Sequence, residues 1–157
     1  MKIENYFLRY AFPCAYIIMQ KGEIDKSELA ELEKIAVNNS DISRNRLEKI
    51  FHRAFDHIKE LAKIMDKDAW DQEVIKQYFR SYHNKIIEQG KGAYATAPQI
   101  LKELSKVNKA TIISQKDDIL KVEFENKKRY VLNHFVPTAK VNDEVYIHYG
   151  YAVELAR

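Results

Sequence analysis

The sequence is poor in residues that cross-link, break or bend a chain: its 157 residues include one cysteine, four glycines and three prolines. A single cysteine excludes an intramolecular disulfide framework and a zinc site made only of cysteines, and it suits a reducing compartment. So few glycines and prolines argue against long low-complexity loops. The longest apolar stretch, Tyr6 to Met19, contains Arg9 and Pro13 and is too short to span a membrane. We therefore expect a soluble cytoplasmic protein.

Catalytic signatures are also missing. The chain has no Gly-rich phosphate loop, no Ser-His-Asp order and no paired-carboxylate motif. The net charge of +3 is mild, so it permits a partner with an acidic face without requiring nucleic acid. Ten tyrosines and seven phenylalanines supply much aromatic area, which contributes heavily to cores and interfaces. We predict that the protein is not an enzyme and that its partner is another protein.

The first two thirds of the chain have helical periodicity. Apolar residues recur there every three or four positions, as on the buried face of a helix. Asp25 and Glu28 have the spacing of a capping box, and Gly90-Lys91-Gly92 is a stop signal. The expected helices span about 3–20, with a bend at Pro13, and about 25–37, 41–65, 68–89 and 98–107.

The period changes from 3.6 to 2 near residue 107. Leu120, Val122 and Phe124 alternate with charged residues, which predicts a half-buried strand. Asn126-Lys127 and Asn142-Asp143 are expected turns, and Gly150 marks a bulge or a bend. Such short strands bury enough surface only if they close into a barrel. We therefore predict an α+β protein, with an all-α helical domain over 1–106 and a small OB-like antiparallel β-barrel over 107–157.

The most specific pattern is the block from Val141 to Val153, which reads VNDEVYIHYGYAV. It follows Val136-Pro137 and three expected strand segments, Ala110–Ile113, Leu120–Phe124 and Lys128–Val131. In this order, the segment from Val107 to Leu155 resembles the HypC/HupF family of nickel–iron hydrogenase maturation chaperones. The last block of that family typically reads Val-Gly-Asp, any residue, Val, any residue, Val-His, any residue, Gly-Phe-Ala-Ile. The resemblance covers about a third of the chain.

The resemblance implies an OB-like barrel that docks a hydrogenase maturation scaffold protein or a hydrogenase large-subunit precursor. It places the docking surface around His148, Tyr146 and Tyr149. Family members also carry a cysteine just ahead of the first strand, which helps to hold an iron centre. The corresponding stretch here, Leu104 to Asn108, has no cysteine. We therefore expect an accessory protein of this type with no resident cofactor, and iron only as transient cargo.

Two residues are candidate metal ligands. The Cys14 thiolate is a soft ligand and could replace the missing family cysteine if the helical region folds back over the barrel. Its neighbours Phe12, Pro13 and Ile17 instead favour a buried, inert thiol. His148 corresponds to the family histidine, and strand alternation points it away from the barrel core. It is either a docking or ligand residue, or an exposed strand residue without a role.

Three further features remain open. Lys127, Lys128 and Arg129 form a basic hairpin, which supports the alternative hypothesis of a nucleic-acid-binding barrel, although a solvated edge explains the charges equally well. His52 and Asp56 are four residues apart on one expected helix and could bind a metal, but they are also typical of a charged solvated face. The helical spacing of His83 predicts a histidine at the edge of the core.

Overall fold

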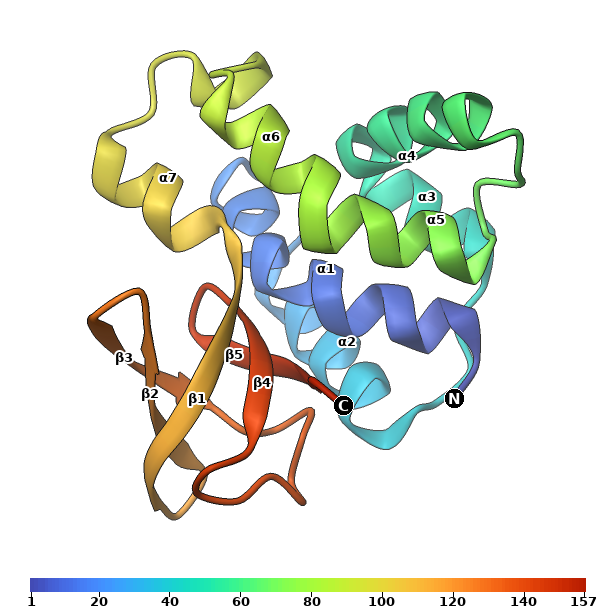
Figure 1. Ribbon diagram of the computed structural model, residues 1–157. Helices are drawn as coiled ribbons and strands as arrows, with labels where there is room; N and C mark the ends of the chain where they lie inside the picture. Colours follow the sequence, from blue (N-terminus) through green and yellow to red (C-terminus); the bar gives the residue numbers. More distant parts are fainter. The chain divides into compact units, whose positions relative to one another are not determined.

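Helices α1–α7 precede strands β1–β5 in the computed structural model, which describes residues 1–157 (Figure 1). The chain divides into two compact units, Met1–Tyr82 and His83–Arg157. The α-helices are α1 (Ile3–Gln20), α2 (Lys26–Asn38), α3 (Arg44–Ile50), α4 (His52–Met65), α5 (Gln72–Gln77), α6 (His83–Glu88) and α7 (Gln99–Ser105). A π-helical turn η1 (Tyr78–Tyr82) joins α5 to α6, and η2 (Gly92–Tyr94) is a 3-10 turn. No helix combines the length and the apolar character that a membrane crossing requires.

The first unit, 1–82, is built around aromatic side chains. The Phe7 ring of α1 lies 4.8 Å from the Phe55 ring and 5.6 Å from the ring of Trp70. At the start of α2, the Asp25 carboxylate accepts a hydrogen bond from the Glu28 amide at 2.8 Å, as its capping position predicts. Large aromatic areas buried against one another hold these helices together.

The helix expected over 41–65 is interrupted. Phe51 separates α3 from α4 and has a non-helical backbone, with φ −101° and ψ 38°. Its side chain is buried and its ring lies 5.6 Å from that of Phe7. The apolar period continues through Phe51 because both helices bury the same face, so the sequence pattern did not show the break.

The five strands are β1 (Val107–Lys116), β2 (Ile119–Phe124), β3 (Lys127–Leu132), β4 (Glu144–His148) and β5 (Tyr151–Leu155). They form a closed barrel in the order β1-β2-β3-β5-β4, which confirms the predicted fold class. One detail differs from the prediction: β3 pairs with β5 in parallel, so the barrel is mixed rather than fully antiparallel. Its core contains eleven buried residues: Ala110, Ile112, Leu120, Val122, Phe124, Val131, Val136, Ala139, Val145, Ile147 and Ala152.

Two tight turns carry left-handed backbone. The β2–β3 hairpin turns at Glu125 and Asn126, with φ of 48° and 61°, one residue earlier than expected. Positive φ at both central residues is the mark of a type I′ hairpin, which suits the twist of the strands. At the β4–β5 turn the positive φ, 48°, falls on Tyr149 rather than on the neighbouring Gly150.

The second compact unit begins earlier than the predicted barrel domain. Secondary structure does change from helix to strand near residue 107, but α6 and α7 belong to the same unit as the barrel. One reason is that the Asn84 side chain of α6 hydrogen-bonds to the backbone of Val107 at the start of β1. A periodicity switch marks where the local conformation changes, whereas a unit boundary depends on contacts between distant residues.

Candidate metal centre

His148 lies at the end of β4, on the outer side of the barrel wall. Val145 and Ile147 point into the barrel core, so alternation along the strand directs His148 to the other face, as predicted. The side chain is nevertheless completely buried, with 0% of its surface exposed. The outward direction of His148 therefore agrees with the expectation, whereas its burial does not, and a docking role for this residue stays a prediction. Strand alternation identifies the face of the sheet, but it does not show whether another element covers that face.

His83 is the first residue of α6 and follows directly after the π-helical turn. Its side chain is buried, with 6% exposed, in line with the expected position at the edge of the core. A π-helical turn inside an α-helix is rare and is often found at functional sites. The extra residue that it inserts changes the rotational phase of the helix, so the turn sets the direction in which His83 projects.

Asn84 fixes α6 against the barrel wall. Its amide nitrogen donates to the Val107 carbonyl at 2.7 Å, and its amide oxygen accepts from the Val107 N–H at 2.9 Å. Val107 is paired with His148 across the β1–β4 ladder. The residue after His83 is therefore attached to the strand neighbour of His148, which explains why the two histidines meet.

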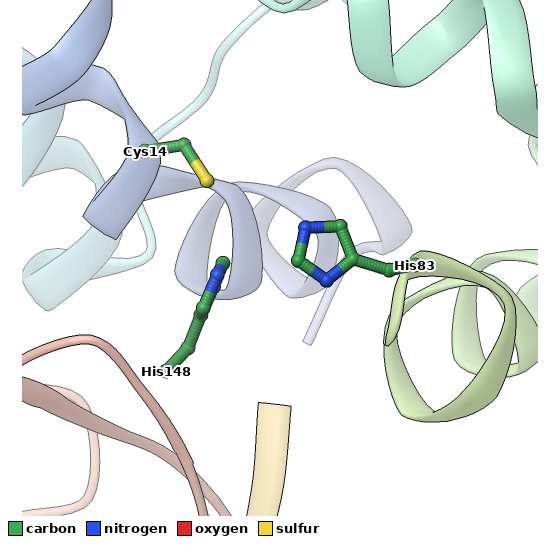
Figure 2. Close-up of side chains that lie close together, drawn as sticks. All are labelled: Cys14, His83 and His148. Carbon is green, nitrogen blue, oxygen red and sulfur yellow. The ribbon is translucent and has the colours of Figure 1, made fainter. Parts of the chain in front are cut away.

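The two imidazole rings lie edge to face, with their centroids 5.2 Å apart and an interplanar angle of 79°. Figure 2 shows them projecting from α6 and β4 toward each other. Their nearest candidate ligand nitrogens lie within 4.8 Å. Two nitrogens on one tetrahedral zinc, each bound at ~2.0–2.1 Å, are roughly 3.3 Å apart. A shift of up to about 1.5 Å through ring rotation would therefore let one ion bind both histidines.

Neither a protein-family model nor a curated protein matches this chain. The likeness to hydrogenase maturation chaperones thus stays a prediction that rests on the Val141–Val153 block. The types of side chain at the site indicate which metals it could bind. Neutral imidazole is the commonest protein ligand for transition metals and suits zinc, copper, iron and nickel.

Figure 2 also labels Cys14, which belongs to α1 in the first unit. The side chain is half-buried by its accessible surface. Desolvation by the surrounding protein raises the pKa of the Cys14 thiol to about 12. A protonated thiol is a poor nucleophile, so the geometry agrees with the inert cysteine that its apolar neighbours suggest.

The two tyrosines expected at the docking surface have different environments. Tyr146 is half-buried in the middle of β4, opposite Lys109 of β1 and Glu154 of β5. Tyr149 is held from several sides: its hydroxyl lies 2.5 Å from Ser105 Oγ, and its amide donates to the Leu104 carbonyl at 3.3 Å. Its ring lies 5.1 Å from the His148 ring. Tyr149 therefore connects α7 to the strand end that carries His148.

Each of the three cations of the basic hairpin lies close to a side chain of the same unit. Lys127 lies 3.3 Å from a carboxylate oxygen of Glu103, and Lys128 lies 3.9 Å from one of Glu123. The Arg129 guanidinium sits over the Phe124 ring at 5.0 Å, and desolvation lowers its pKa. Each of these cations has an acidic or aromatic neighbour, so the arrangement differs from an open basic groove for a nucleic-acid backbone.

The His52 and Asp56 pair is not part of any group of three candidate ligands. Both residues are exposed on α4, and His52 lies 3.7 Å from a carboxylate oxygen of Glu23. His57 contacts Glu60 at 3.4 Å on the same helix. These residues form the charged solvated face that was the simpler interpretation of their spacing.

Helical spacing predicts His83 only as a residue at the edge of the core and does not connect it with His148. The two lie far apart in the chain, on a helix and on a strand, and no periodic pattern links such positions. Asn84, which shares a short helix with the apolar pair Ile86 and Ile87, was the available signal, because an amide side chain needs a hydrogen-bonding partner when it is partly buried.

Proposed function

We propose that this protein is a non-enzymatic accessory protein that binds a transition-metal ion at His83 and His148. The observation that carries the proposal is the meeting of two buried imidazoles, with ligand atoms within 4.8 Å, in a chain of only five histidines. Burying a polar ring costs free energy unless it makes hydrogen bonds or other favourable contacts. A shared metal ion would provide such an interaction for both rings at once.

The accessory role is supported by the barrel and by the Val141–Val153 block. Under the resemblance to HypC/HupF proteins, the barrel docks a protein partner, of the kind represented by a hydrogenase maturation scaffold or a large-subunit precursor. The metal would then be cargo or a structural element of the docked state, with iron as one candidate. The buried position of His148 favours a role as ligand over a role in the docking surface.

The test is metal binding by the full chain. We expect purified apoprotein to bind one equivalent of Zn²⁺ or Co²⁺, measured by calorimetry and by elemental analysis after desalting. His83→Ala and His148→Ala should each weaken binding by roughly 100-fold or more, since even residues that only support metal ligands contribute about 10–100-fold.

His57→Ala is the matched control, because it removes a partly exposed histidine from the first unit and should leave the affinity unchanged. Circular dichroism of all three variants checks that the fold is intact. A wild-type chain that binds no divalent transition metal would contradict the proposal. So would equal affinities for the wild type and a folded His148→Ala variant.

A further inference from the structure

The barrel closes through very little pairing between β3 and β5. Leu132 is the one residue of β3 that pairs with β5, opposite Tyr151, and its N–H donates to the Gly150 carbonyl at 2.8 Å. On its other side, the whole of β3 pairs with β2. Because β5 starts beside the end of β3, residues 127–131 have no paired strand on the side that faces away from β2. We call this side of residues 127–131 the free edge of β3.

Two residues of the free edge present main-chain groups that no strand of the barrel uses. Along a strand, the N–H and C=O groups point alternately to one neighbouring strand and to the other. The Leu132 N–H points toward β5, so the main-chain groups of Tyr130 and Lys128 have the same direction. Neither residue has a partner in β5. Such groups at the edge of a sheet are a template for pairing with another chain.

The free edge is accessible and basic. Tyr130 is 65% exposed, and the side chains of Lys127 and Lys128 are 55% and 56% exposed. Each lysine lies near one carboxylate, Glu103 at 3.3 Å and Glu123 at 3.9 Å, but exposed ion pairs of this kind contribute little to stability. Both ammonium groups can therefore approach a further carboxylate.

The charges decide which kind of strand the free edge accepts. A second copy of β3 would bring Lys127 and Lys128 close to the same lysines of the other chain, and like charges at facing positions destabilise a strand pair. Lysines on an edge strand commonly prevent such self-pairing. A strand with glutamate or aspartate side chains would instead form favourable pairs with both lysines. Charge complementarity thus selects an acidic segment over a second copy of this chain.

We propose that the free edge of β3 binds an extended, acidic segment of a partner protein, which adds to the barrel as a further strand. In this mode of recognition, main-chain hydrogen bonds supply the affinity and the side chains beside them supply the specificity. Lys128 and Tyr130 form those hydrogen bonds, while Lys127 and Lys128 attract the acidic side chains. The site is separate from the metal centre, because neither histidine of that centre belongs to β3. Each proposal can therefore fail without the other.

Amide hydrogen exchange of the full-length chain, followed by NMR, tests the proposal. The probe is a short synthetic peptide that alternates glutamate with valine, and the control peptide carries lysine in place of each glutamate. We expect the acidic peptide to slow exchange of the Lys128 and Tyr130 amides, because both become hydrogen-bonded. The lysine peptide should leave both exchange rates unchanged.

Variants of one residue separate the main chain from the side chain. Tyr130→Pro removes an edge N–H, a change that edge strands tolerate, and should weaken binding of the acidic peptide by about 5-fold or more. Tyr130→Thr keeps the N–H and loses only the ring, so it is the matched control and should bind nearly as well as wild type. Replacing Lys127 and Lys128 together with glutamine should mainly slow association. Fluorescence anisotropy of the labelled peptide measures affinities and rates, and circular dichroism checks the fold.

Unchanged exchange at Lys128 and Tyr130 with saturating acidic peptide would overturn the proposal. Equal affinities of this peptide for wild type and a folded Tyr130→Pro variant would do the same, as would equal binding of the acidic and lysine peptides. Protection of the two amides by a higher protein concentration alone would assign the edge to a second copy and would also overturn it. If Tyr130→Pro does not fold, the exchange measurement on wild type decides.

Discussion

His148 illustrates how much one residue's role depends on what covers it. Alternation along β4 correctly places it opposite Val145 and Ile147, on the outer face of the barrel wall. In an isolated barrel such a side chain would face water and be available to a partner. Here it is fully buried and faces His83 instead. Of the roles that the sequence leaves open for His148, burial favours that of a ligand over that of a docking residue.

Two neighbouring tyrosines should separate docking from stability at the residue scale. Tyr146→Ala should weaken the complex with a protein partner by about 1 kcal/mol or more, because aromatic residues are frequent interface anchors. Tyr149→Phe should instead lower the free energy of unfolding by about 1 kcal/mol, since it removes the hydroxyl contact with Ser105 at 2.5 Å. Affinity for a partner captured from native lysate and chemical denaturation measure the two effects.

Neutral replacements of Lys127, Lys128 and Arg129 are the control for this comparison, and they should affect mainly the association rate. Under the nucleic-acid alternative, the neutral triple variant should weaken binding more than Tyr146→Ala does. Tight, salt-sensitive binding of a single-stranded oligonucleotide that the neutral triple variant loses would contradict docking through Tyr146.

At the scale of elements, a single side chain attaches a helix to a strand. The Asn84 side chain donates one hydrogen bond to the Val107 carbonyl and accepts another from the Val107 N–H. This contact aligns α6 with the β1–β4 edge. The π-helical turn directly before α6 sets the phase of the same helix. The position of His83 relative to His148 thus depends on two local features that lie next to each other in the chain.

Asn84→Ala should lower the free energy of unfolding by about 1–3 kcal/mol, because it leaves buried backbone groups of Val107 without these two partners. Asn84→Asp should have a smaller effect, since its carboxylate can still accept from the Val107 N–H. Both variants should bind metal more weakly than wild type. Thermal unfolding and zinc titration are the measurements, with Asn45→Ala on the exposed face of α3 as the control. Unchanged zinc affinity in a destabilised Asn84→Ala variant would show that the hydrogen bonds between Asn84 and Val107 do not position the metal site.

The whole molecule is organised into units that do not coincide with its secondary-structure classes. Helices α6 and α7 share a unit with the barrel, and contacts such as Asn84–Val107 and Tyr149–Ser105 connect them to it. A fragment of residues 83–157 should therefore unfold cooperatively on its own. A fragment of residues 107–157 should be markedly less stable, because it loses these contacts and exposes the His148 face.

Circular dichroism during thermal denaturation compares the two fragments. Equal unfolding temperatures would contradict this prediction and would place the start of the barrel domain at residue 107. Small domains bury a limited fraction of their surface, so the loss of two packed helices from a unit of this size is expected to matter.

Local patterns accounted for most of the elements, and for specific reasons. The Asp25 cap, the strand alternation of Leu120, Val122 and Phe124, and the loss of helical period near residue 107 all depend on residues close together in the chain. The break at Phe51 and the parallel β3–β5 pair escaped the same reasoning. The first continues an unchanged apolar period, and the second depends on how the barrel closes.

The amino-acid sequence by itself determined the α+β class, the change from helix to strand and the face of β4 that carries His148, because each follows from hydrophobic periodicity. Only the tertiary structure decided that His148 is buried, that His83 meets it and that α6 and α7 belong with the barrel. Those facts arise from contacts such as Asn84 with Val107, between residues separated by a long stretch of chain. Periodicity records which side of an element is apolar, and packing decides which element covers the other side.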